Sequence, residues 1–583
     1  MSFQWILPSA ERDPRVDKLR SLLGVHEFIC RRLVSLGIEE FEQARQFFNP
    51  RLEDLHSPLL MKDMSRAVER INAACEEGQK IMIYGDYDVD GTTAVSLLYD
   101  FLKTHYQNLI TYIPDRYREG YGVSRQGIDK AIEEKVSLII ALDCGIKAVD
   151  KVEYALKQGI DFIICDHHTP GDTLPPAYAI LNPKQRDCNY PFKELSGCGV
   201  GLKLVQALCC EWQIDDSHWH RLLDLAAVSI GADIVSLSGE NRILAHFGLK
   251  KINESPRPAI AALLKAAGKE NQKLTIGDVV FLLGPRINAA GRMYHGSLAV
   301  ELLTSNDQEM VEQLSKELNE HNTERQKTDR QITTEALQQI EEELDLEAWS
   351  TVVFHPQWHK GVIGIVASRL IENHYRPTVV FTEKKGVLTG SARSVEGFDL
   401  YAALEKCPSL EQFGGHKAAA GMTLAKERLN AFKQEFERAV RNSLKPEQRK
   451  ARLLIDGELK ARAINRRFYN TMMRLAPFGP DNLPPLFVSH HLENAGSRPV
   501  GEDDAHLKLR LRDPESGFIM DGIAFRMGQR FKELEQGKAL SAVYHLEINR
   551  FRDQEQLQWR VLDFCFSERF QEAPSEPASR EAN

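Results

Sequence analysis

Carboxylates and histidines follow three apolar stretches in the first third of the chain, each at the point where a predicted strand ends. The stretches and the residues after them are Lys80–Gly85 with Asp86, Asp88 and Asp90, Val136–Leu142 with Asp143, and Asp161–Cys165 with Asp166, His167 and His168. In a parallel sheet, the C-terminal ends of neighbouring strands meet at one crevice, where ligands bind in open α/β folds. Carboxylates gathered there repel one another unless cations lie between them. The sequence therefore predicts a cluster of divalent metal ions at this edge.

The types of side chain indicate which metals would bind. Asp88 and Asp90 lie two residues apart in a turn, so both can face one site. Asp143 would add a ligand from a second strand, and His167 or His168 a ligand from a third. Carboxylates with one or two imidazoles suit Mn²⁺ or Mg²⁺, and the absence of thiolates argues against structural zinc. Two such ions about 3.5–4 Å apart can activate a water and hold a phosphodiester for in-line displacement.

Each of these signals also has a structural explanation. The run from Asp86 to Gly91 matches the start of a calcium loop, but Leu97 stands where an EF-hand needs its last glutamate. Asp143 alone could cap a helix. Two adjacent histidines after an apolar strand are rarely core residues, because a buried pair needs two sets of partners. Taken together, the three strand ends favour metal catalysis.

The length and composition of the chain limit its domain number, its location and its class of partner. A chain of 583 residues is too long for one core, so two to four domains are expected. No run of 18 uncharged apolar residues exists, and Met1–Pro8 lacks the pattern of a signal peptide, so no membrane association is expected. The ten cysteines contain no C-x-x-C pair, which favours a reducing, cytoplasmic location. The net charge of −9 does not decide between partners, because nucleic-acid binding depends on local charge.

Helical and strand patterns alternate from about Leu55 to Pro183, which predicts a mostly parallel sheet covered by helices. Besides the three strands above, the pattern predicts strands at Leu109–Pro114 and Ala179–Leu181 and helices at Met64–Glu77, Gly91–Leu102, Gly127–Glu134 and Val149–Gln158.

A charged stretch without Pro or Gly, Asp307–Asp345, predicts a long helix that connects two domains. Beyond it, a smaller α/β domain that ends near Leu444 is expected. Its predicted elements are strands at Thr351–Phe354, Thr378–Phe381 and Gly386–Thr389 and a helix at Val362–Asn373.

The last part of the chain has a β pattern. His506–Arg512 alternates strictly between leucine and basic residues, which predicts a strand with one buried face. Four more strands and a short helix before the last two give the order of an OB-fold barrel, which often binds oligonucleotides. These are Leu486–Leu492, Phe518–Phe525, Ser541–Asn549 and Gln556–Phe564, with the helix near Gly528–Glu535.

The motifs resemble those of a known family. Asp166-His167-His168 is the motif that names the DHH phosphoesterase superfamily, and Tyr84–Gly91 resembles the first motif of RecJ-type single-strand-specific exonucleases. Further matching motifs follow in the family's order along nearly the whole chain: Gly284–Arg292, His359–Gly364, Ser391–Ser394 and Gly414–Ala418. Several specific motifs in order are much stronger than any one of them.

The resemblance implies a domain plan. The plan comprises a DHH catalytic domain (55–306), the connecting helix (307–345), a DHHA1-type domain (346–444) and an OB-fold domain (453–567). Outside it, we expect an N-terminal helical segment (1–54) and, from the composition after Gln571, a disordered tail (571–583). The resemblance also implies processive 5′→3′ hydrolysis of single-stranded DNA to mononucleotides by two Mn²⁺ or Mg²⁺ ions, in DNA repair and recombination. A single-strand-binding protein and a helicase are the partners it implies, and nothing requires more than a monomer.

The family's site residues carry over onto matching positions. The implied metal ligands are Asp88, Asp90, Asp143, His167 and Asp233, with Asp86 as a less certain supporting residue and His168, Asp143 and Asp166 as the catalytic residues. Asp233 follows only from the match of Ile230–Asp233 to the fourth motif, not from spacing.

The resemblance also implies how DNA is held. Arg116, Ser391 and Arg393 would form a pocket for a 5′-phosphate, whose oxygens an arginine fork matches. Arg286 and Arg292 would hold backbone phosphates, and Gly414, Gly415 and His416 would allow close approach of a nucleotide. The structural alternatives are solvated surface charges for the arginines and a plain turn for the glycines.

Two other functions compete with the nuclease. One is a DHH phosphodiesterase that cleaves short oligonucleotides or a cyclic dinucleotide, and the other is a strand-binding module with a structural metal site. The long connecting helix and the OB-like domain argue against the first, because a small substrate needs neither. The complete set Asp88, Asp90, Asp143 and His167 argues against the second.

Overall fold

The computed structural model describes residues 3–8, 11–270, 272–343, 347–551 and 554–566. The chain divides into two compact units. One comprises Pro50–Ile332 with Pro477–Asn482, and the other Met1–Asn49, Thr333–Ala476 and Leu483–Asn583. The predicted disordered tail lies outside the described residues. Within the described ranges, no helix is both long and apolar enough to cross a bilayer.

The first unit is built on a five-stranded parallel sheet. Its order is β3 (Leu109–Tyr112), β2 (Lys80–Gly85), β4 (Val136–Leu142), β5 (Asp161–Cys165) and β6 (Ala179–Leu181). Every neighbouring pair is parallel. The parallel sheet predicted from the sequence is therefore confirmed, and all strand ends that carry acidic residues lie along one edge.

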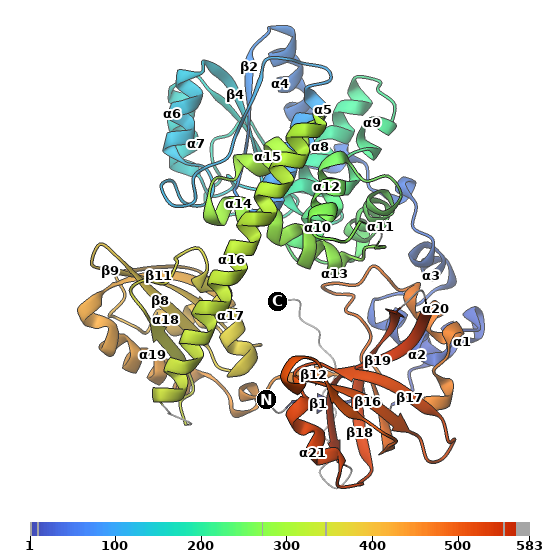
Figure 1. The fold of residues 1–583 in the computed structure, drawn as a ribbon. Coiled ribbons are helices and arrows are strands. Elements are labelled where there is room, and N and C mark those ends of the chain that lie inside the picture. The colour runs from blue at the N-terminus through green and yellow to red at the C-terminus, as the bar shows by residue number, and fades with distance from the viewer. Residues whose placement is uncertain (1–2, 9–10, 271, 344–346, 552–553, 567–583) are drawn as a thin grey trace. The chain divides into compact units, whose positions relative to one another are not determined.

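Helices cover both faces of this sheet (Figure 1). On one face the core contains residues of α6 (Arg125–Glu133) and α7 (Val149–Lys157). On the other it contains α4 (Met64–Glu76), α5 (Val89–Leu102) and α8 (Gly197–Glu211). Strands buried on both faces have continuous apolar sequences, which is why these strands are recognisable in the chain.

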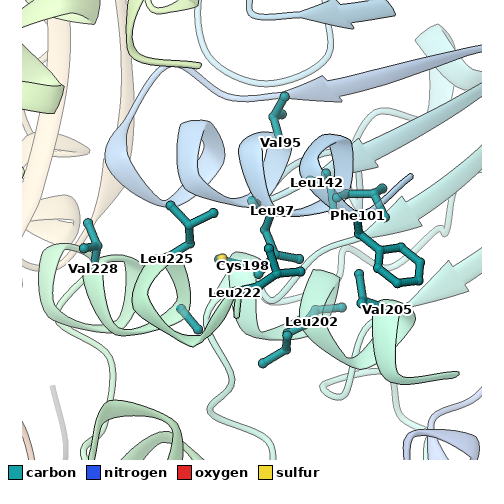
Figure 2. Close-up of a cluster of buried hydrophobic side chains, with 14 of the residues drawn as sticks. Val95, Leu97, Phe101, Leu142, Cys198, Leu202, Val205, Leu222, Leu225 and Val228 are labelled. Atoms are coloured by element: carbon teal, nitrogen blue, oxygen red, sulfur yellow. The ribbon is translucent and has the colours of Figure 1, made fainter. Parts of the chain in front are cut away.

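A second helical layer packs against α5 and α8. Its central helix, α10 (Leu223–Ala232), is mostly apolar and is buried from Leu223 to Gly231, as is typical of a core helix. Figure 2 shows Leu97 of α5, Cys198 of α8 and Leu225 of α10 in one cluster of buried side chains. This packing fixes the ends of three helices that carry polar residues of the site.

The remaining helices of the first unit follow in chain order, and the last of them continues into the second unit from Thr333 on. They are α9 (Ser217–His220), α11 (Gly239–Glu254), α12 (Pro258–Ala266), α13 (Ile276–Asp278), a π-helical turn (Val279–Leu283), α14 (Gly284–Met293), α15 (Ser297–Thr304) and α16 (Gln308–Glu343). The 36 residues of α16 confirm the predicted long helix.

The second unit contains a mixed sheet of five strands in the order β10 (Gln412–His416), β11 (Ala419–Ala425), β9 (Val387–Arg393), β8 (Thr378–Lys384), β7 (Thr351–Phe354). Only the β7–β8 pair is parallel. Its helices are α17 (Ile363–Asn373), α18 (Leu400–Leu404) and α19 (Leu429–Ser443). The sequence predicted β7, β8, β9 and α17. It did not predict β10 and β11, whose many glycines and alanines are poor strand formers.

One carboxylate of this domain is held by a set of hydrogen bonds. Glu437 of α19 accepts from the backbone N–H of Trp349 at 3.0 Å, and from the N–H and hydroxyl of Ser350 at 2.9 and 2.6 Å. Burial raises the pKa of Glu437, but the hydrogen bonds from Ser350 and Trp349 lower it by a larger amount. The pKa of Glu437 therefore lies below its usual value of 4.5.

We expect Glu437→Gln to accelerate amide hydrogen exchange at Trp349 and Ser350 by about tenfold at pH 7, because bonds to a charged acceptor are lost. A depressed carboxyl pKa stabilises the fold at neutral pH, and that contribution disappears as the pH falls through the folded-state value. The difference from wild type should therefore shrink below the usual pKa of 4.5. Exchange measured by mass spectrometry, with the exposed Glu427→Gln as control, checks this. A difference that persists unchanged at low pH contradicts it.

The C-terminal domain is a closed barrel. Its strands are β14 (Phe487–Asn494), β16 (His506–Arg512), β17 (Ile519–Ala524), β18 (Leu540–Phe551) and β19 (Gln554–Phe566). They pair in the order β14-β18-β19-β17-β16, and a β14–β16 pairing closes the ring. The predicted OB-like barrel is confirmed. The predicted helix is α21 (Phe531–Leu534) preceded by a 3₁₀ turn.

The first 49 residues belong to this second unit. They contain α1 (Pro14–Leu23), α2 (Glu27–Ser35) and α3 (Phe41–Phe48), and also a strand, β1 (Gln4–Ile6). β1 pairs in parallel with β12 (Arg452–Leu454), far away in the sequence. Three further short elements are β13 (Gly457–Glu458), α20 (Arg466–Met473) and β15 (Arg498–Val500).

Contacts with the barrel explain this arrangement. The indole N–H of Trp5 donates to Asp563 of β19 at 2.9 Å. The ring of Phe28 packs against that of Phe487, with centroids 4.8 Å apart. The N-terminal segment thus completes the barrel-containing unit.

Candidate active site

Asp143 directly follows β4 and adopts an unusual backbone conformation. Its φ is +58°, in the left-handed region, and its N–H donates to the carbonyl of Cys165 at 2.8 Å. Residues other than glycine seldom adopt this conformation, and those that do cluster at functional sites. This left-handed residue ends β4 and places Asp143, almost fully buried, at the C-terminal edge of the sheet.

Asp88 and Asp90 are held by the starts of two different helices. Asp88 caps α5 by accepting from Gly91 N–H at 3.0 Å, so α5 begins two residues earlier than predicted. Asp90 accepts from the N–H groups of Gly197 and Cys198, at 2.7 and 2.8 Å, at the start of α8. Helix N-termini favour carboxylates, because their free N–H groups and the helix dipole attract negative charge.

Asp90, Asp143 and Asp233 meet at the imidazole of His167. Its Nε2 lies 3.2 Å from Asp143 Oδ1, 3.5 Å from Asp233 Oδ2 and 3.7 Å from Asp90 Oδ2. Two atoms that each bind one Mg²⁺-sized ion at about 2.1 Å can be no more than about 4.2 Å apart. All three separations meet this limit. Ligand atoms of Asp143, His167 and His168, and those of Asp90, His167 and Asp233, form two groups whose members all lie within 4.8 Å of one another.

The unsatisfied atoms of the cluster fit a metal centre. Both carboxylate oxygens of Asp143 and both ring nitrogens of His167 are buried and have no hydrogen-bond partner within the described part of the chain. Such groups are costly in a protein interior unless something coordinates them. The donors are carboxylate oxygens and imidazole nitrogens, which suit Mn²⁺ or Mg²⁺. Asp90, Asp143, His167 and Asp233 therefore form a set of donors suited to the predicted metals, and the place of Asp88 among the ligands stays a prediction.

The pKa values of the carboxylates support the same conclusion. Burial raises the pKa of Asp143 well above its usual value, and the charges of Asp90 and Asp88 raise it further. Burial raises the pKa of Asp86 to about 8, with Asp88 adding to the effect. Burial and Asp90 raise the pKa of Asp233 to about 8. The cluster cannot easily carry its full negative charge unless cations compensate it.

Asp166 positions His168. Its Oδ1 lies 2.7 Å from His168 Nδ1 and accepts from the N–H groups of His167 and His168, while Oδ2 accepts from Ile146 N–H at 2.9 Å. Although burial lowers the pKa of His168, the hydrogen bond and charge of Asp166 raise it to about 9. Asp166, predicted as catalytic, is thus engaged in orienting the imidazole.

The other nitrogen of His168 faces Tyr121, a residue that the sequence analysis did not single out. The Tyr121 hydroxyl lies 3.3 Å from His168 Nε2. Its ring also packs against Tyr87, between Asp86 and Asp88, with centroids 5.8 Å apart. The sequence feature that could have pointed to Tyr121 is its position in the loop that follows β3, five residues after the predicted phosphate-binding Arg116.

Two of the predicted phosphate-binding arginines border the acidic loop. The Arg116 guanidinium lies over the Tyr87 ring, 4.9 Å from its centroid. Arg292 belongs to α14, where a Cβ on the neighbouring Gly291 would lie 2.6 Å from the Tyr87 carbonyl. Arg286 instead donates to Leu282 O and to Asn319 at 2.7 and 3.0 Å, which ties α14 to α16.

Ser391 and Arg393 lie together on β9 of the second unit. Arg393 donates to the Ser391 hydroxyl at 3.1 Å. A Cβ on Gly364, at the start of α17, would lie 2.9 Å from an Arg393 nitrogen and 3.0 Å from the Ser391 hydroxyl. A helix start beside a guanidinium and a hydroxyl is suited to a phosphate group.

Gly414, Gly415 and His416 are the last three residues of β10, and all three are exposed. Gly415 has a φ of +144°, and a Cβ there would lie 2.3 Å from the Ala419 carbonyl, so only glycine fits. Gly414 has open space where a side chain would be. His416 Nδ1 accepts from Ala418 N–H at 3.2 Å. The role of these three residues in binding stays a prediction.

Family models match three parts of the chain. They describe the DHH family N-terminal domain over residues 80–230, the DHHA1 domain over 348–442 and the RecJ OB domain over 455–563. The single-stranded-DNA-specific exonuclease RecJ of Bacillus subtilis is 37% identical over 561 residues, which cover 95% of this chain and 70% of that protein. The chain belongs to the RecJ family. The Escherichia coli RecJ is 35% identical, over 85% of this chain and 89% of its own length.

Solved RecJ structures share the fold. The crystal structure of RecJ in complex with Mn²⁺ from Thermus thermophilus has a TM-score of 0.82 at 26% identity, and covers 97% of this chain and 79% of its own. A crystal structure of an exonuclease RecJ bound to manganese has a TM-score of 0.58 at 32% identity, over 67% and 96% of the two chains. Manganese in these relatives agrees with the ligand set of this RecJ-family chain.

Proposed function

We propose that this protein is a metal-dependent exonuclease that degrades single-stranded DNA processively from the 5′ end to mononucleotides. The observation that carries the proposal is the cluster at the sheet edge, where buried Asp143 and His167 have unsatisfied atoms beside Asp90 and Asp233. The curated relatives are named single-stranded-DNA-specific exonucleases, which supports the choice of substrate. By family, the activity serves DNA repair and recombination.

The chain's own residues have distinct tasks at this site. Asp88, Asp90, Asp143, His167 and Asp233 would hold the metals. Bound Mn²⁺ or Mg²⁺ lowers the pKa of water and stabilises negative charge on phosphate oxygens. Asp166 fixes the ring of His168 through Nδ1, which leaves Nε2 beside Tyr121 to hydrogen-bond a phosphate oxygen. Arg116, over Tyr87, places a guanidinium next to the acidic loop.

The 5′ end and the rest of the strand would be held by other groups. Ser391, Arg393 and the start of α17 form the candidate phosphate cradle in the DHHA1-type domain. On the barrel, Lys508, Arg510 and Arg512 of β16 are exposed, while the leucines between them are buried. A basic barrel surface binds single strands with little sequence preference.

Cellular context follows from the family rather than from the site. We expect a monomer that acts in the cytoplasm with a helicase and a single-strand-binding protein. All ten cysteines lie in the described part of the chain and are free, which agrees with a reducing compartment.

One assay tests the proposal. The full chain with Mn²⁺ should release mononucleotides from 5′-labelled single-stranded DNA and leave a blunt duplex intact. Turnover of dinucleotides alone would instead select a DHH phosphodiesterase. Strand binding without turnover would select a binding module. A reaction with EDTA is the control, because chelation should stop cleavage.

Replacing Arg393 with alanine should reduce the preference for a 5′-phosphate over a 5′-hydroxyl by about tenfold or more, because a charge-assisted hydrogen bond to the end group is lost. Initial rates on the two DNA strands measure this preference. The exposed Arg428 of the same domain provides the matched control, Arg428→Ala. An unchanged preference in Arg393→Ala would remove Arg393 from the pocket.

A further inference from the structure

The hydroxyl of Ser229 is in contact with one of the predicted metal ligands. Ser229 lies in α10 and is completely buried. Its Oγ lies 2.6 Å from Asp90 Oδ1 and 2.6 Å from the Oγ of Ser196, the residue that caps α8. An ionised carboxylate can only accept, so the Ser229 proton points to Asp90, and Ser196 donates to Ser229.

This contact gives the two oxygens of Asp90 different environments. Oδ1 accepts from Ser229 and from Cys198 N–H at 2.8 Å. Oδ2 accepts from Gly197 N–H at 2.7 Å and lies 3.7 Å from His167 Nε2. Two protein donors therefore occupy Oδ1, while Oδ2 keeps a lone pair that faces the cluster.

Ser229 also links Asp90 to another ligand. Asp233 follows Ser229 by four residues, and its N–H donates to the Ser229 carbonyl at 2.9 Å. Residues four apart in a helix lie on the same face. The same face of α10 thus carries both Asp233 and the Ser229 hydroxyl that contacts Asp90. The ligand atoms of Asp90 and Asp233 lie within 4.8 Å of each other.

We propose that Ser229 is a positioning residue of the metal site. Its hydroxyl locks the Asp90 carboxylate so that Oδ2 alone faces His167 and Asp233, and so sets the distance between ligands on α5 and α10. Without this bond, Asp90 can rotate and present either oxygen. The inference rests on the metal cluster of the proposed function, but not on DNA as the substrate.

The test is a titration of the full chain with Mn²⁺, in which electron paramagnetic resonance measures the free ion. We expect Ser229→Ala to weaken Mn²⁺ binding by about 10–100-fold, as is typical when a partner of a metal ligand is removed. Raised Mn²⁺ should restore much of the lost nuclease activity. Ser96→Ala is the matched control, because Ser96 is equally buried but its hydroxyl donates only to the Thr92 carbonyl within α5.

Melting of the metal-free proteins separates positioning from folding. Ser229→Ala and Ser229→Cys should both fold and melt within the range of Ser96→Ala. An affinity for Mn²⁺ as high as that of Ser96→Ala, or the unfolding of both Ser229 variants, would overturn the proposal. A wild-type chain that binds Mn²⁺ but leaves single-stranded DNA intact would refute the nuclease and not the role of Ser229.

Discussion

The Asp143→Ala variant will lose single-stranded-DNA cleavage by at least about a hundredfold, while the full chain still binds the strand. Asp143 offers two buried oxygens without hydrogen-bond partners in the described structure, one of them 3.2 Å from His167 Nε2. Removing them removes a predicted metal ligand, but it leaves the basic groups that are expected to hold phosphates. Single-turnover cleavage and fluorescence anisotropy of a labelled strand measure the two properties separately.

Asp150→Ala is the control for Asp143→Ala. Asp150 is an exposed carboxylate in the first turn of α7, and its loss should leave cleavage unchanged. Retention of more than a small part of the wild-type rate by Asp143→Ala would show that the cluster is not the catalytic centre. Loss of strand binding together with cleavage would show that Asp143 supports the fold instead.

Thermal melting of the same variant reports on the metal. The buried carboxylates of the wild-type protein repel one another, so bound Mn²⁺ should stabilise the fold and raise its melting temperature. At a Mn²⁺ concentration one hundred times the dissociation constant, binding adds about 2.7 kcal/mol to the free energy of unfolding. Asp143→Ala should gain much less. Its metal-free form should not melt below that of the wild type, because burial already raises the pKa of Asp143 well above the usual value and makes its charged form unfavourable.

The parts of the site that could be predicted are those that follow buried parallel strands. β2, β4 and β5 are apolar on both faces, so their ends were visible in the sequence, and with them Asp88, Asp143 and His167. Asp233 gave no such signal. It follows a helix that is mostly apolar and buried on all sides, and only the packing of α10 on α5 and α8 brings it to the cluster.

Long-range pairing explains the other omissions. Ser229 reaches the site through contacts between helices, and nothing in its local sequence marks those contacts. β1 pairs with β12, and a three-residue strand carries no periodicity that indicates its partner. The barrel strands were predicted closely because alternation, as in His506–Arg512, is a local signal that one buried face imposes.

Gly197→Ala, a change of one methyl group, should damage the site nearly as much as the loss of Asp143. Gly197 opens α8, and its N–H donates to Asp90. A Cβ at this position would lie 2.5 Å from Asp143 Cβ and 2.6 Å from its Oδ1. Asp143 follows a strand in the core of the sheet and cannot move away without disturbing it. We expect the cleavage rate to fall about a hundredfold, because a displacement of a catalytic group by about 1 Å can have an effect of this size. The affinity for Mn²⁺ should fall by a similar factor.

The same helix provides the matched control. A Cβ on Gly199, two residues further along α8, would meet its nearest neighbour, the Ser196 hydroxyl, at 3.3 Å. Gly199→Ala therefore requires only a small adjustment at the start of α8 and leaves Asp143 in place. Its cleavage rate and Mn²⁺ affinity should stay within a few-fold of wild type. If the two alanine variants behave alike, contact between Gly197 and Asp143 does not position the ligand, and the tight packing of α8 against the strand end has no catalytic consequence.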